Sequence, residues 1–375
     1  MFARSDSSLL ARWWWTIDRW LLFLSCLLIV LGIIFVFAAS PAVATKIGLP
    51  SFYFIKRHIA YMFLGIVIMV AISLMNEEQI RLFSAICIAL TVLGIIATLI
   101  FGVQIKGARR WLSLAGLSIQ PTEFLKPVLV VMCAWLFAEQ KEDSSFPGNK
   151  IAVGLVLFCI ALTLAQPDVG TSFLITCVFI GQFILAGLPL LWVASSILLG
   201  VTGLLGAYFL FPHVSQRIDR FLFATNTDKY SEGYQISQSL EALHKGGWLG
   251  RGPGEGIIKK NLPDAHADFI FSVAGEEFGV IICVALILLF GAILLRTTVR
   301  IIQDQNLFRI LAVSGLMSQI VLQAIINMSS AVHLIPTKGM TLPFISYGGS
   351  SVLATSISMG IILGFTRRYI RETHE

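Results

Sequence analysis

The chain has 375 residues, of which 57% are hydrophobic and 13% are charged, about half the charged share of an ordinary soluble domain. With a mean hydropathy of +0.84, this composition excludes a soluble enzyme and predicts an all-α protein that crosses a membrane many times. The net charge of +6 comes from lysines and arginines spread over the chain without a basic block, so we expect no nucleic-acid partner.

Ten apolar segments approach the roughly 20 residues that an α-helix needs to cross a bilayer. Ala42-Val43-Ala44 after the first segment resembles a signal-peptide cleavage site, but the apolar run is too long for a signal sequence and nine more runs follow. We therefore expect ten transmembrane helices, at about 20–39, 58–75, 82–101, 122–138, 151–166, 169–187, 190–211, 269–295, 308–328 and 346–366.

An even number of helices places both termini on one side of the membrane. The prediction is a single membrane domain, 1–375, with an N-terminal segment at 1–19, a large outer loop at 212–268 and a C-terminal tail at 367–375. Arginines flank both ends and suggest that the termini are cytoplasmic. The outer side is also rich in lysine and arginine, which would suit an anionic ligand.

The first polar cluster, at 106–127, lies between the third and fourth predicted helices. Arg109 and Arg110 would either bind a phosphate or mark a solvated loop. Glu123 and Lys126 follow at i,i+3 spacing, which places them on one helix face and predicts an ion pair or a contribution to a cavity.

Two further clusters interrupt the apolar pattern. Asp168 lies in a break between the fifth and sixth helices, where it is either a helix cap or a site residue. The segment 333–351 precedes the last helix, and its two prolines and three glycines predict an irregular re-entrant segment that is buried in protein or lines a wet cavity. The run 246–256 has six glycines; it is either a tightly turned or flexible loop or a phosphate cradle.

The fourth cluster, at 261–279, has acids and a histidine where the long loop enters an apolar helix. Ionisable groups at a membrane boundary are expensive, and function is the usual reason for keeping them. Asp268 is our first candidate for a functional acid. His266 would assist it or hydrogen-bond within the loop, and Glu276 and Glu277, about two turns deeper, would be structural or balance protons.

These clusters are similar to the signature blocks of the SEDS family of bacteria (shape, elongation, division and sporulation), and the resemblance covers nearly the whole chain. The segment around Lys338 resembles the division branch of the family more than the elongation branch. Ala267 departs from the family pattern, which usually has a threonine there. The blocks are GARRWL, SIQPTEFLKP, QPDVGTS, EGYQISQSLEALHKGGWLGRGPGEG, DFIFSVAGEE and PTKGMTLPFISYGGSS.

The resemblance implies a peptidoglycan glycosyltransferase that polymerises lipid II, with Asp268 as the essential acid and catalytic base. A divalent cation, Mg or Mn, would help to neutralise the pyrophosphate. The implied partners are a class B penicillin-binding protein and other divisome proteins, at the septum of the inner membrane. Residues expected to bind substrate are Arg109, Arg110, Glu123, Lys126, Asp168, His266, Lys338, Ser346 and Tyr347.

Two alternatives belong to other functional classes. A lipid II flippase would also need a cavity for the headgroup, but it would expose binding charges to both faces of the membrane, whereas the polar clusters gather on one. A scaffold that only recruits a transpeptidase would not need Asp268.

Overall fold

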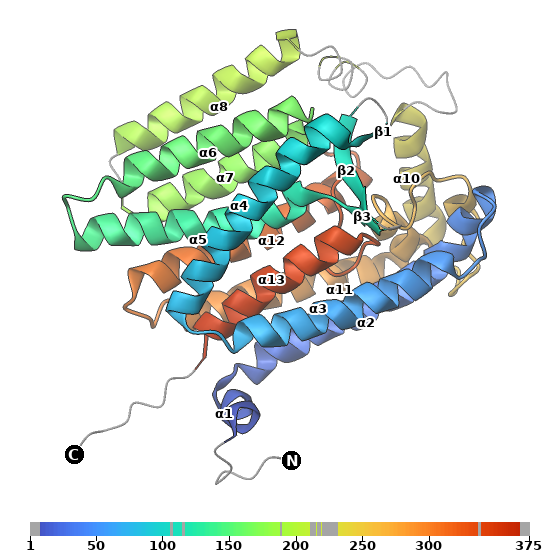
Figure 1. The fold of residues 1–375 in the computed structure, drawn as a ribbon. Helices are drawn as coiled ribbons and strands as arrows, with labels where there is room; N and C mark the ends of the chain where they lie inside the picture. Colours follow the sequence, from blue (N-terminus) through green and yellow to red (C-terminus); the bar gives the residue numbers. More distant parts are fainter. Residues whose placement is uncertain are drawn as a thin grey trace.

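The computed structural model describes residues 8–105, 108–114, 117–187, 190–210, 215, 219, 232–336 and 339–367. The chain forms a bundle of long helices with short strands at one end (Figure 1). The helices are α1 (Leu9–Thr16), α2 (Arg19–Lys46), α3 (Tyr53–Ser73), α4 (Glu77–Phe101), α5 (Pro121–Glu142), α6 (Gly148–Ala165), α7 (Val169–Leu185), α8 (Leu190–Leu210), α10 (Glu232–Gly246), the 3₁₀ helix η1 (Ile258–Lys260), α11 (Ile270–Ile301), α12 (Leu307–Ala331) and α13 (Gly349–Phe365).

Each of the ten predicted membrane segments coincides with one of these helices. In the described part of the chain, seven are long and apolar enough to cross a membrane, namely α2 to α6, α11 and α12. The helices α7 and α13 and the Gly200–Leu210 part of α8 are shorter apolar helices. The prediction of a helical, multi-pass membrane protein is confirmed. The division into domains stays a prediction, and part of the loop 212–268 lies outside the described residues.

Helices α5 and α12 lie at the centre of the bundle. The most apolar stretch of α5 is 83% buried and that of α12 is 67% buried, against 44% or less for the other five long helices. The last helix, α13, packs against α3, α5 and α12 and is buried along nearly its whole length. This burial explains how polar side chains on α5 and α12 avoid the lipid, which has no hydrogen-bonding groups to offer them.

Several helices begin at residues that satisfy the free backbone amides of the first turn. The Asp18 carboxylate accepts from the amides of Trp20 (3.0 Å) and Leu21 (3.1 Å) at the start of α2. Asn76 forms a capping box with Gln79 at the start of α4. Pro121 begins α5, where the missing amide hydrogen costs nothing.

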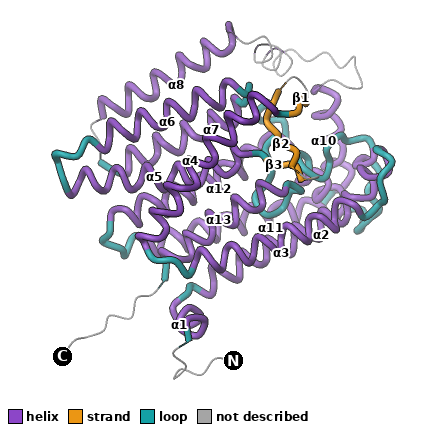
Figure 2. The backbone as a smooth tube through the Cα atoms, viewed as in Figure 1, coloured by secondary structure: helices purple, strands orange, loops and turns teal. Residues whose placement is uncertain are grey.

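The segment after α4 forms strands that the sequence pattern did not predict. β1 (Val103–Ile105) and β3 (Leu117–Ile119) pair antiparallel with the two ends of β2 (Ala108–Leu114). The strands lie near α10 at the end of the bundle opposite α1 (Figure 1), and most of the irregular chain beside them gathers there too (Figure 2). We call this the strand end: β1–β3, α10 and the segments 246–268 and 339–348.

The long helix α11 was predicted as one continuous span, but it is broken at Gly279, which has φ +80° and ψ 178°. A side chain there would meet an unfavourable φ and would collide with the Trp248 carbonyl. The loop before α11 satisfies the broken helix: the amide of Val280 donates to the Gly247 carbonyl at 2.9 Å. The break in α11 is therefore stabilised by hydrogen bonds to the glycine-rich loop, residues 246–256.

Candidate functional site

Asp268 lies at the strand end, two residues before the start of α11, and is half-buried. Its amide donates to the carbonyl of Asp264 at 3.0 Å, which closes one helical turn. From α12, the Asn327 amide nitrogen donates to the Asp268 carbonyl at 3.0 Å and to the Met340 carbonyl at 2.6 Å. A Cβ atom on Gly339 would lie 3.4 Å from Oδ2 of Asp268. One side chain of α12 thus holds the acid and the re-entrant segment next to each other.

The segment before α13 is tied to the same turn by further hydrogen bonds. The Ser346 hydroxyl donates to the Ala267 carbonyl at 2.5 Å and accepts from the Leu342 amide at 2.8 Å. The amide of Tyr347 donates to the His266 carbonyl at 2.9 Å. Ser346 is buried, so its hydroxyl shapes the backbone around Asp268.

His266 lies in an aromatic cluster beside the acid. Its ring centroid is 4.2 Å from that of Phe54 and 5.1 Å from that of Tyr347. Burial lowers the pKa of His266 to about 4, and the nearby charge of Asp264 only partly opposes this effect. The imidazole is therefore neutral at pH 7, which argues against a role as a proton donor.

Lys126 is at the centre of a buried network that joins three segments. Its ammonium donates to the Glu123 carboxylate at 2.9 and 3.0 Å and to the Gln323 side-chain oxygen at 2.9 Å. The Gln323 amide in turn donates to the Thr341 carbonyl at 3.0 Å, and the Thr341 hydroxyl meets that of Ser351 at 2.5 Å. The predicted Glu123–Lys126 ion pair is present, and it connects α5 through α12 to the segment beside Asp268.

Arg109 and Arg110 point to different places because successive side chains of strand β2 alternate in direction. Arg110 bonds to the carbonyls of Gln166 and Pro167, and its guanidinium lies 3.6 Å from the Asp168 carboxylate. Arg109 is exposed and donates to the Leu99 carbonyl at 3.4 Å. Among the described residues, Arg109 is thus the more accessible of the two for an anion.

Asp168 combines the two roles that the sequence left open. Its carboxylate accepts from the amide of Thr171 at 3.3 Å and from the Thr171 hydroxyl at 2.9 Å, which caps α7. The same carboxylate pairs with Arg110 and so joins the first two polar clusters. The amide of Gln120 donates to the Ser350 hydroxyl at 3.0 Å and joins the first cluster to the third. All four clusters therefore meet at the strand end.

Sequence reasoning missed Gln323 and Asn327, the α12 side chains that hold the site together. The signal was present: Gln319, Gln323 and Asn327 recur every four residues in an apolar helix, which puts three amides on one face. Polar groups in a spanning helix are rare and mark an interior face.

Glu276 and Glu277 have structural partners rather than contacts with Asp268. The Glu276 carboxylate accepts from the three amides of residues 257–259 at 2.7 to 3.0 Å. The Glu277 carboxylate accepts from the Gly254 amide at 2.8 Å and forms a buried ion pair with Lys259. The glycine-rich loop is thus packed tightly against the first turns of α11.

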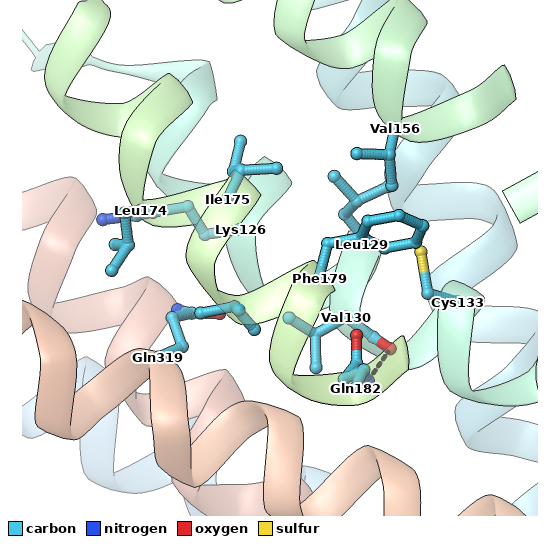
Figure 3. Close-up of a pocket in the computed structure, with 11 residues that line it drawn as sticks. Lys126, Leu129, Val130, Cys133, Val156, Leu174, Ile175, Phe179, Gln182 and Gln319 are labelled. Atoms are coloured by element: carbon cyan, nitrogen blue, oxygen red, sulfur yellow. Dashed lines mark hydrogen bonds between the residues drawn. The ribbon is translucent and has the colours of Figure 1, made fainter. Parts of the chain in front are cut away.

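Lys338 lies outside the described residues. In the part of the chain that the structure describes, no group of three or more histidine, cysteine, aspartate or glutamate side chains is placed to hold a metal ion. A small cavity lies between the polar face of α12 and helices α5 to α7, with Lys126 and Gln319 on one side and Phe179, Cys133 and Val156 on the other (Figure 3). It has room for little more than a water molecule, so it is too small for a sugar.

Comparison with known proteins gives matches over nearly the full chain. The family described as "Cell cycle protein", whose model covers FtsW, RodA and SpoVE, matches residues 19–369. A Caulobacter vibrioides protein named "Probable peptidoglycan glycosyltransferase FtsW" is 42% identical over 98% of this chain and 93% of its own length. The Bacillus subtilis "Stage V sporulation protein E" is 32% identical over 93% of this chain and 97% of its own.

Solved structures share the fold. RodA of Thermus thermophilus matches with a TM-score of 0.67 and 23% identity, over 94% of this chain and 97% of that one. A chain from a structure titled "Structural coordination of polymerization and crosslinking by a peptidoglycan synthase complex" matches with a TM-score of 0.73 and 24% identity, over 93% and 97%. Together with the family match over residues 19–369, these similarities show that the chain belongs to the SEDS family of FtsW, RodA and SpoVE.

Proposed function

We propose that this protein is a peptidoglycan glycosyltransferase that polymerises lipid II during cell division. The observation that carries the proposal is the 42% identity, over 98% of the chain, to a relative named as an FtsW peptidoglycan glycosyltransferase. The geometry of the strand end supports it, because the turn that carries this half-buried acid is contacted by two separate segments, α12 and 339–348.

The reaction is an inverting displacement at the anomeric carbon of a sugar pyrophosphate. Asp268 takes the proton from the 4-hydroxyl of the acceptor sugar as that oxygen forms the new β-1,4 bond. The bond from the anomeric carbon to the pyrophosphate oxygen breaks, and undecaprenyl pyrophosphate leaves with the electron pair. Arg109 and Arg110 lie in β2 at the strand end. Together with Lys338, they would neutralise the departing charge.

A divalent cation would be bound mainly through the substrate. The described residues bring no three ligands together, but Mg²⁺ is commonly held by substrate phosphates with only one or two carboxylates. The cation would supply charge neutralisation at the pyrophosphate. No step of the proposed mechanism depends on it.

The proposed partner is a class B penicillin-binding protein, with other divisome proteins at the septum. The structure that matches with a TM-score of 0.73 is titled as a complex that coordinates polymerization and crosslinking. In the proposed topology both termini are cytoplasmic and the strand end is periplasmic. Depletion of the protein should then give undivided filaments, and rounded cells would instead indicate a role in elongation.

The arrangement of charges favours a polymerase over the alternative, a lipid II flippase. A flippase must bind the headgroup from both faces of the membrane. At the end of the bundle opposite Asp268, the described charges include two ion-paired groups: Asp18 with Arg296 and Arg300, and Arg309 with Glu77 and Asp304. These charges are paired with one another, whereas Arg109 at the strand end is exposed, which makes the strand end the better headgroup site.

Polymerisation of labelled lipid II by the purified protein with its class B partner tests the proposal. Asp268→Asn should reduce polymer formation by about 10²- to 10⁴-fold, the usual contribution of a general base. Asp264→Asn is the matched control: it makes the same change four residues away at an exposed position, where φ of +49° suits asparagine. We expect it to keep near-normal activity.

The other outcomes separate the alternatives. Equal polymer from the native protein and Asp268→Asn would remove this residue from the mechanism. Headgroup translocation in vesicles without polymer from any variant would indicate a flippase. Normal division of cells that carry Asp268→Asn would indicate a scaffold.

A further inference from the structure

A second cavity, of about 550 Å³, opens on the side of the bundle between α2, the turn after it and the segment 253–260. Its apolar wall includes Ile34, Phe37, Phe52 and Phe278. The rings of Phe37 and Phe52 are stacked with centroids 5.7 Å apart, and both side chains are about half exposed. The volume lies within the range of roughly 300–1,000 Å³ that is typical of small-molecule sites.

The polar part of this groove is positively charged. Three of the described lining residues are lysines and none is acidic. Lys46, in the last turn of α2, and Lys260, at the end of η1, are both exposed. Lys46 is the last residue of the spanning helix α2, so the charged rim lies where that helix leaves the hydrocarbon and lipid headgroups begin.

One wall of the groove is held in place by the buried lysine. The Lys259 ammonium donates to the carbonyl of Ala38 on α2 at 2.9 Å and to that of Gly254 at 3.2 Å, and it is paired with Glu277 of α11. The groove is therefore built from segments that are fastened to one another, unlike an open lipid-facing helix surface. Among the described lining residues, neither Asp268 nor Asn327, which donates to the Asp268 carbonyl, is present.

We propose that this groove is a binding site for an anionic phospholipid of the surrounding bilayer. An acyl chain lies along the aromatic wall, and the phosphate binds between Lys46 and Lys260. Charge complementarity selects the occupant: two exposed ammonium groups without a carboxylate among the lining residues favour an anionic over a zwitterionic headgroup.

The test is titration of the purified full-length protein in detergent with phosphatidylglycerol or phosphatidylcholine, read by native mass spectrometry. We expect one phosphatidylglycerol to bind more tightly than phosphatidylcholine. Lys46→Gln/Lys260→Gln should weaken its binding by about 30-fold, since each lysine near a lipid surface contributes about 1 kcal/mol. Ala42→Phe, which fills the apolar wall and keeps both charges, should weaken both lipids.

Lys141→Gln/Lys150→Gln, at two exposed positions away from the groove, is the matched control and should bind phosphatidylglycerol normally. Unchanged binding by the groove variants, or equal binding of the two lipids, would overturn the proposal. Displacement by undecaprenyl pyrophosphate would assign the groove to the substrate. Displacement by the purified class B partner would make it a protein interface. The two lysine double variants should keep the native melting temperature, because all four lysines are exposed. Ala42 is buried, so the result for Ala42→Phe is taken only from protein that keeps the native melting temperature.

Discussion

At Asp268 and His266, the surroundings decide what each side chain can do. Asp268 lies beside the Gly339 backbone and is positioned through its own carbonyl by Asn327. His266, two residues earlier, is enclosed by Phe54 and Tyr347 and has a pKa of about 4. Two residues of one turn thus have different roles. Asp268 is an acid near the start of α11, and His266 is a neutral ring that packs the turn against α3.

The low pKa of His266 predicts a loss of stability in mild acid. Between pH 6.5 and pH 4 the unfolded chain binds a proton at this residue and the folded protein does not, so folding becomes less favourable as the pH falls. At pH 5 the cost is about 2 kcal/mol. Melting of the detergent-solubilised protein at pH 7 and pH 5 should show a smaller decrease for His266→Gln than for the native protein. An equal decrease in both would show that His266 is not the group responsible.

The amide face of α12 offers a matched pair of substitutions. Asn327→Leu leaves the carbonyls of Asp268 and Met340 without their donor, which should cost about 1–3 kcal/mol and strongly reduce polymerisation. Gln319→Leu, two turns earlier on the same face, removes a buried side-chain oxygen that has no partner among the described residues, so stability should be unchanged or higher. Melting temperature and lipid II polymerisation would be measured for both. Equal effects would contradict a specific role for Asn327.

At the scale of elements, the most informative feature is the joint between α11 and the glycine-rich loop. Gly279 breaks the helix, and the broken turn is satisfied by the loop backbone at 247–248. Gly250 has φ +78°, and a side chain there would collide with the carbonyl of Glu277. Glycine is required because backbone meets backbone at this joint. The glycines at this joint allow close packing of the loop on α11, which explains them without a phosphate-binding role.

The buried Lys259–Glu277 pair predicts a non-additive result. Glu277→Gln leaves an ammonium buried among carbonyls and should lower the free energy of unfolding by about 3–5 kcal/mol. The double variant Glu277→Gln/Lys259→Met removes both charges and should recover most of that loss. A double-mutant cycle of melting temperatures measures the coupling. Additive losses would show that the two groups contribute independently.

At the scale of the whole molecule, ion pairs join distant helices at the end of the bundle opposite Asp268, and the sequence pattern did not predict them. Asp18 caps α2 and also pairs with Arg296 and Arg300 near the end of α11, 278 and 282 residues away. Burial alone would raise the pKa of Asp18, but the hydrogen bonds from Arg296, the Leu21 amide and Arg300 lower it below its usual value. The pair joins the first spanning helix to the helix that follows Asp268.

Asp18→Ala should therefore destabilise the bundle without disabling the site. The carboxylate is buried and both arginines are partly exposed, so we expect a loss of about 1–3 kcal/mol at neutral pH. The native contribution should disappear as the pH falls through the lowered pKa of Asp18. Polymerisation per folded molecule should stay within about twofold of the native value. Loss of activity in a fully folded Asp18→Ala protein would reveal coupling between the two ends.

The sequence by itself determined the class of the protein and the elements that cross the membrane. Long apolar runs must form helices, because lipid cannot satisfy backbone amides and carbonyls, so ten segments could be located from composition and length. Helix geometry predicted that Glu123 and Lys126 lie on one face within pairing distance, and it gave a helix cap as one of two roles for Asp168.

Only the tertiary structure decided which polar groups meet. Asn327 lies 59 residues from Asp268, and Gln323 lies 197 residues from Lys126, so local periodicity holds no information about their contacts. The different directions of Arg109 and Arg110 depend on strand β2, which the sequence pattern of this polar segment did not predict. The break at Gly279 likewise depends on a loop that supplies the missing hydrogen bonds from outside the helix. Contacts of this kind arise from packing between distant segments, and packing is a property of the folded chain.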